Sequence, residues 1–218
     1  MKTLIVTASS KSKRDLTEHK FNYSHQTFTN SITSSFKKTL LDSRQNVMKN
    51  MGLDPGPDLL DVNIAESDDL FLPAYIRYAG RTYSKIDHDA WNVAVENPEK
   101  VDCVILSALY GLIRFNEPIR NYPIKQVDKI PNKSSIQNYW KNQGASDWLF
   151  DYVKKNDVND VKFVLSTSYS GIISRDKLME RLQDELGVSS EDKQLKSKGM
   201  ASMLERGRYI NQFLLENK

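Results

Sequence analysis

Short runs that are mainly apolar occur at 3–7, 101–106 and 161–165. A run without regular alternation of apolar and polar residues is typical of a strand that is buried on both faces of a parallel sheet. A weaker alternation of apolar and polar residues at 60–64 predicts a further, half-buried strand. The pattern therefore predicts a sheet whose central strands are parallel.

Within 24–50, apolar residues recur at intervals of four and seven, which is the spacing of one helical face. Pro73 favours a helix start, and Gly80 and Gly187 favour helix ends with left-handed backbone. Ser174 is expected to cap a helix N-terminus with its hydroxyl. The predicted helices lie at 24–50, 73–77, from about 87, 134–155, 174–186 and 200–215.

Strands that alternate with helices predict an α/β fold, with a mixed, mostly parallel sheet covered by helices on both faces. The 218 residues, 39% of them hydrophobic, suit one domain over 1–218. The single cysteine, Cys103, lies in an apolar run and is expected to be a buried thiol in a reducing compartment. No segment has the length of a signal or membrane-spanning sequence, so we expect a cytoplasmic protein that does not bind membranes.

Three polar loops are expected beyond the carboxyl ends of the parallel strands, at 8–15, 107–122 and 166–174. They supply hydroxyls, lysines and arginines but few acids, which favours phosphate over a divalent metal. The net charge is only +3, but both ends of the chain are basic. The acidic stretch 58–69 is expected to lie away from any nucleic acid.

The first loop offers small hydroxyl residues, whose backbone N–H groups can face an anion, together with basic side chains. An ordinary solvated basic loop is the alternative. In the second loop, arginines can hold phosphate and tyrosines can stack on bases. Its alternative is a structured loop pinned by an ion pair between Arg114 and Glu117. The expected phosphate contacts are Lys11, Lys13, Arg14, Arg114 and Arg120, with Lys198, Arg206 and Arg208 near the C-terminus. The expected pocket residues are Ser9, Ser10, Ser107, Tyr110, Gly111, Glu117, Tyr122, Ser166 and Ser168.

Other kinds of site are disfavoured. No Cys or His set has the spacing of a zinc site, and no nucleophile elbow follows a strand, so we expect no metal and no cofactor. The segment 77–85 presents either a helix hairpin that binds phosphate or a plain turn between two helices, because a single glycine is a weak signal.

Several motifs resemble the YaaA peroxide-stress family. The segment SALYGLIRFNEPIRNY at 107–122 carries the strongest likeness, and LIVTASSKSK, YAGRTY and KGMASMLERGRYINQF add to it. The resemblance implies one α/β domain with a positively charged cleft, DNA binding and a role in limiting oxidative damage. Lys85 departs from the family pattern where a second hairpin glycine is expected, and lysine tolerates a positive φ poorly.

The loop at 8–15 and the segment 110–124 are also similar to the core domain of archaeosine synthase, which modifies a 7-deazaguanine base in tRNA. That family carries a cysteine where this chain has Ser9, and an alcohol is far less readily ionised than a thiol. The residues thus support three hypotheses. The first is a nucleic-acid binder, for DNA rather than RNA. The second is an enzyme acting on a nucleotide or modified base, in which the three loops form a closed pocket and Lys13, Ser107 or Glu117 takes part in the chemistry; Lys13 and Glu117 pointing at a common ligand would favour it. The third is a domain that binds a small molecule or a protein and whose basic ends are solvated.

Overall fold

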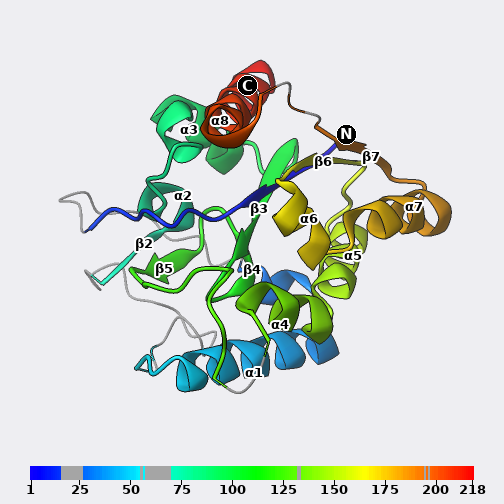
Figure 1. The fold of residues 1–218 in the computed structure, drawn as a ribbon. Helices are drawn as coiled ribbons and strands as arrows, with labels where there is room; N and C mark the ends of the chain where they lie inside the picture. Colours follow the sequence, from blue (N-terminus) through cyan, green and yellow to red (C-terminus); the bar gives the residue numbers. More distant parts are fainter. Residues whose placement is uncertain (16–26, 55, 57–69, 132–133, 194, 196) are drawn as a thin grey trace.

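The structure is a computed structural model that describes residues 1–15, 27–54, 56, 70–131, 134–193, 195 and 197–218. Its main sheet has five strands in the order β4-β3-β1-β6-β7 (Figure 1). All neighbouring strands run parallel except β4, which is antiparallel to β3. The strands of this sheet are β1 (Thr3–Ala8), β3 (Val101–Ser107), β4 (Gly111–Arg114), β6 (Asp160–Val164) and β7 (Ser189–Asp192).

Helices lie on both sides of this sheet, with α3 and α8 on one side and α1, α4, α5 and α7 on the other (Figure 1). The helices are α1 (Ser34–Asn50), α2 (Ala74–Arg77), α3 (His88–Glu96), α4 (Ile136–Gln143), α5 (Ala145–Lys155), α6 (Thr167–Ile172), α7 (Arg175–Leu186) and α8 (Gly199–Glu216). Two 3₁₀ helices, η1 (Thr29–Ser31) and η3 (Tyr83–Lys85), and a small antiparallel pair, β2 (Phe71–Pro73) with β5 (Pro118–Arg120), complete the described elements. The predicted α/β fold with a mixed, mostly parallel sheet is confirmed.

The mainly apolar runs form the centre of the core, as predicted. Every residue of β3 is buried, and so are Leu4, Ile5 and Val6 of β1. Central strands are covered on both faces, which explains why their sequence shows no alternation. Cys103 lies in this core as a free thiol, which confirms its expected burial.

Two predicted helices have different bounds. The first begins at Ser34 rather than near residue 24, because Ile32 and Thr33 have extended backbone, although Phe28 and Ile32 are buried as their spacing suggested. The helix predicted over 134–155 is two helices. Gly144, with φ of 97°, separates α4 from α5, and a left-handed residue cannot continue a right-handed helix.

The predicted long loops contain regular structure that the sequence pattern did not reveal. The segment 107–122 folds back as β4 and β5, and α6 occupies most of 166–174. Strand β7 is polar and was missed. Ser174 precedes α7 as predicted, but its φ is 47° and its side chain makes no capping hydrogen bond. The strand predicted at 60–64 and the acidic stretch 58–69 lie outside the described residues.

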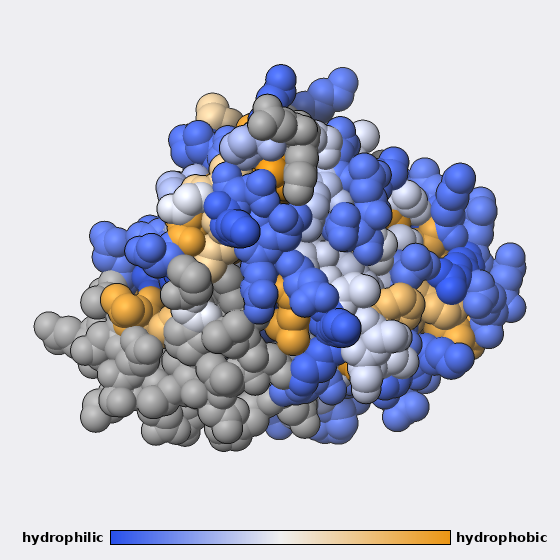
Figure 2. Space-filling view, turned by 90° about the horizontal axis from the view of Figure 1, so that it is seen from below, coloured by the Kyte–Doolittle hydropathy of each residue, from blue (hydrophilic) through white to orange (hydrophobic). Residues whose placement is uncertain are grey.

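The surface is mainly polar on the face seen in Figure 2, where hydrophobic residues form small groups separated by hydrophilic ones. Scattered apolar side chains of this kind are normal on a protein surface. No helix in the described part of the chain is long and apolar enough to cross a membrane. Charge and polar chemistry are therefore the better guides to a functional site.

Candidate functional site

A cavity of about 630 Å³ lies where β1 and β6 end. Residues 7–12 and 79–83 line it, together with Ser166, Tyr169 of α6, and Met203 and Arg206 of α8. The chain leaves β1 toward β3 on one side and leaves β6 toward β7 on the other. Such a point, beyond the carboxyl ends of strands whose connections diverge, is the usual ligand site of an open α/β sheet.

The loop after β1 is held in place by backbone hydrogen bonds to two segments. Ser9 donates its N–H to Leu106 at the end of β3 (2.9 Å), and Ser12 accepts from the N–H of Ala79 (3.0 Å). Arg14 donates to the carbonyl of Arg77 (2.7 Å). The loop thus runs along residues 77–79, which brings Lys11 and Arg81 to the same cavity.

Two glycines allow the cavity walls to approach each other. A Cβ on Gly80 would overlap the side chain of Ser10, and a Cβ on Gly207 would overlap the carbonyl of Thr82. Gly80 is therefore needed for close approach. It does not have the left-handed backbone predicted for it, because α2 already ends at Tyr78 in an extended conformation. Gly207 lets α8 pack closely against η3. This packing places Arg206, the neighbour of Gly207 on α8, at the cavity.

Among the residues that the structure describes, three cationic side chains line the cavity: Lys11, Arg81 and Arg206. Lys11 and Arg81 are exposed and Arg206 is half-buried. Among the described lining residues there is no Asp or Glu. The Nε of Arg206 is buried without a hydrogen-bond partner in the described structure, and its Nη1 donates to Ser202 (3.4 Å). Burial lowers the pKa of Arg206, and the nearby carboxylates Asp192 and Glu205 oppose this shift.

Ser9 lies beside a buried chain of hydroxyl groups. Its side chain is close enough to the hydroxyls of Tyr122 and Tyr169 to lower their pKa, against the larger effect of burial. Tyr122 Oη lies 2.8 Å from Tyr78 Oη and 2.9 Å from Ser107 Oγ. Burial raises the pKa of Tyr122 to about 12, so this chain is made of neutral donors and acceptors at physiological pH.

Lys13 lies beside this chain rather than among the residues that line the cavity. Its Nζ is 3.8 Å from the centroid of the Tyr122 ring and donates to the carbonyl of Lys11 (3.4 Å). Burial, and then the charge of Arg77, lower the pKa of Lys13 to about 8. Lys13 therefore makes a cation–π contact and helps to stabilise the conformation of the loop.

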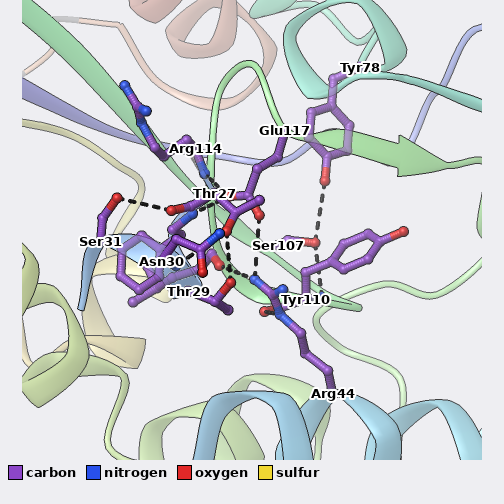
Figure 3. A network of polar contacts seen from close by, with 12 residues as sticks. Thr27, Thr29, Asn30, Ser31, Arg44, Tyr78, Ser107, Tyr110, Arg114 and Glu117 are labelled. Atoms are coloured by element: carbon purple, nitrogen blue, oxygen red, sulfur yellow. Dashed lines mark hydrogen bonds and ion pairs between the residues drawn. The ribbon is translucent and has the colours of Figure 1, made fainter. Parts of the chain in front are cut away.

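Arg114 and Glu117 lie in the interior (Figure 3). Arg114 pairs with Asp102 (3.2 Å), and both side chains are buried. Glu117 accepts the backbone N–H groups of Phe28 (2.9 Å) and Arg114, and lies 3.9 Å from the guanidinium of Arg44. The expectation that Arg114 contacts phosphate is thus corrected, since its charge is already neutralised inside the protein. The alternative, a structured loop held by ion pairs, agrees better with the structure. Arg114 pairs with Asp102, and Glu117 lies near Arg44.

The other expected pocket residues of the second loop are also interior. Ser107, Tyr110, Gly111 and Tyr122 are buried and support β3 and β4 rather than line the cavity. Arg120 donates to the carbonyl of Asp54 (2.7 Å), away from the lining residues.

Of the remaining expected residues, the structure brings Ser9, Ser10, Lys11, Ser166 and Arg206 to the cavity. The expected residues that are exposed but do not line the cavity are Arg14, Lys198, Arg208 and Ser168.

Sequence reasoning missed Arg81, Tyr169 and Met203. The sequence offers a pattern that points to Arg81, because a basic residue directly follows the glycine of YAGRTY. No sequence pattern points to Tyr169 and Met203, since their positions depend on how α6 and α8 pack. Within the described residues, no group of three or more His, Cys, Asp or Glu side chains is placed to hold a metal ion.

The fold and the cavity define an α/β protein that presents cations and hydroxyls at the carboxyl edge of a mostly parallel sheet. The family model described as peroxide stress protein YaaA matches residues 1–218, and the chain belongs to this family. The resemblance predicted from the motifs is confirmed.

Two relatives are similar to this chain at low sequence identity. The chain is 24% identical over 210 residues to a UPF0246 protein of Fusobacterium nucleatum subsp. nucleatum, an alignment that covers 94% of this chain and 78% of that protein. It is 22% identical over 138 residues to a UPF0246 protein of Rickettsia felis, with 63% of this chain and 55% of that protein covered.

Proposed function

We propose that the protein binds nucleic acid, DNA rather than RNA, by contacting phosphate groups with Lys11, Arg81 and Arg206. We further propose that this binding serves the response to peroxide stress for which its family is described. The observation that carries the proposal is the convergence of three cations from distant parts of the chain on one cavity without a lining carboxylate among the described residues.

An anion in the cavity would stabilise this charge placement, because like charges repel and a half-buried guanidinium loses part of its hydration. Lysine neutralises phosphate as a point charge, and arginine binds it through two parallel hydrogen bonds. The preference for DNA rests on the family resemblance.

A salt titration tests this proposal. We would measure binding of a fluorescent duplex of mixed sequence between 50 and 200 mM salt, using the wild type and the Lys11→Ala, Arg81→Ala double variant. Both side chains are exposed, so folding should be unaffected. Each phosphate contact contributes roughly 0.9 to the slope of log affinity against log salt, so the double variant should lower the slope by about two.

The matched control is Lys38→Ala with Lys141→Ala, which removes the same charge. These exposed lysines lie on α1 and α4, on the side of the sheet opposite α8 (Figure 1). The control should keep the wild-type slope. Equal slopes for the wild type and the cavity variant would refute the proposed contacts.

The enzyme hypothesis would be favoured by Lys13 and Glu117 facing a common ligand. Glu117 instead bonds to backbone N–H groups in the interior, and Lys13 covers the ring of Tyr122. Neither side chain lines the cavity. The geometry supports binding better than catalysis by this pair.

A further inference from the structure

The cavity has the features of a site for one phosphorylated unit rather than for a stretch of continuous backbone. We propose that it binds the terminal phosphate of a nucleotide, a phosphomonoester carried by a free nucleoside monophosphate or by the phosphorylated end of a strand. This inference rests on the proposed nucleic-acid binding and names the group that the cavity receives.

The first argument is charge. A phosphomonoester carries about −1.5 to −2 charges at pH 7, with three acceptor oxygens. An internal phosphodiester carries one charge, and a strand spreads its charges along its length at about one per 3.4 Å. Lys11, Arg81 and Arg206 come from three separate segments and surround one volume. That arrangement suits a concentrated charge better than an extended one.

The second argument is the state of Arg206. Its Nε is buried and unpartnered within the described structure, while its Nη1 is occupied by Ser202. Asp192, one of the carboxylates near it, is held by Arg175 at 2.6 Å. A buried donor without a partner is destabilising, and more so when it is charged. A dianionic phosphate in the cavity would stabilise the charge of this half-buried guanidinium.

The third argument is size and wall chemistry. Small-molecule sites have volumes of roughly 300–1,000 Å³, and the cavity, at about 630 Å³, lies within this range. Inorganic phosphate alone would leave much of it unfilled. The ring of Tyr169 and the side chain of Met203, which is 43% exposed, offer apolar surface for a base. Ser10 and Thr82 offer hydroxyls for the phosphate or the sugar.

The experiment compares ligands that differ only in the terminal phosphate. Calorimetry with the full chain would use AMP, adenosine and inorganic phosphate. Fluorescence anisotropy would use a 3′-labelled single strand carrying either a 5′-phosphate or a 5′-hydroxyl. The test variant is Arg206→Met, which keeps an apolar stem, and the control is Arg208→Met on the same helix, outside the cavity. Circular dichroism melting checks that both variants fold, and Arg81→Ala, at an exposed site, provides a second test variant.

The two pairs are AMP with adenosine and the 5′-phosphorylated strand with the 5′-hydroxyl strand. In at least one pair, we expect the phosphorylated ligand to bind at least about tenfold more tightly than its partner. Arg206→Met and Arg81→Ala should remove this preference, and Arg208→Met should keep it. A preference confined to the strands identifies a strand end as the ligand, and one confined to AMP identifies a free nucleotide.

Two results would overturn the inference: equal binding within both pairs, or inorganic phosphate binding as tightly as AMP. If duplex binding still depended on Lys11 and Arg81 in either case, the proposed nucleic-acid function would stand without this inference. If the protein bound AMP but not the duplex, this inference would stand and the proposed nucleic-acid function would fail.

Discussion

Replacing Arg114 by methionine tests whether this residue supports the fold or contacts a ligand. Arg114 and Asp102 form an ion pair at 3.2 Å in which the side chains are 4% and 1% exposed. Asp102 also accepts hydrogen bonds from the Tyr152 hydroxyl and from the N–H of Cys103. Arg114→Met fills similar space and leaves the carboxylate of Asp102 buried without its cation.

Removing one partner of a buried ion pair costs about 3–5 kcal/mol. We expect the lower end of this range, about 3 kcal/mol, because Asp102 keeps two hydrogen-bond donors. Typical domains have a free energy of unfolding of about 5–15 kcal/mol, so the loss is a large fraction of the total. With a urea m-value of about 1–3 kcal/mol/M, the midpoint should fall by roughly 1–3 M.

Urea unfolding followed by tryptophan fluorescence measures this change. The triple variant Arg114→Met, Asp102→Leu, Tyr152→Phe removes the opposite charge and the hydroxyl as well, and should regain most of the lost stability. Duplex binding by the folded single variant should equal that of the wild type. A stability within about 0.5 kcal/mol of the wild type, together with weaker binding, would show that Arg114 reaches the ligand.

Three further outcomes are expected. Gly111→Ala should cost about 1–3 kcal/mol, because φ at Gly111 is 72° and a Cβ would lie 2.9 Å from the Trp140 ring; an unchanged melting temperature would contradict this. Lys13 has a folded-state pKa of about 8 against 10.5 as its ordinary value, so the unfolded chain binds more protons between these values. The stability of the wild type should therefore rise relative to Lys13→Met between pH 8 and 10.5, and a difference independent of pH would argue against it. Burial raises the pKa of the Cys103 thiol well above its ordinary range, so Ellman's reagent should react only after unfolding; rapid reaction of the folded protein would exclude a buried thiol.

The sequence alone determined the α/β class, the central strands and the family. Strands β1, β3 and β6 lie in the middle of the sheet and are largely buried, so their sequences are mainly apolar and can be recognised directly. The motif at 107–122 identified the family, and the hydroxyl and lysine loop after β1 led to Ser9, Ser10 and Lys11. These features depend on residues that are close together in the chain.

Tertiary structure decided which cations are accessible. Arg114 and Lys11 are both basic residues that follow a predicted strand, yet one is neutralised by Asp102 in the core and the other lines the cavity. Arg206 reaches the cavity and Arg208 does not, because Gly207 sets the close packing of α8 against Thr82. Burial and ion pairing depend on contacts between segments far apart in the chain. The spacing of residues within one segment does not predict those contacts.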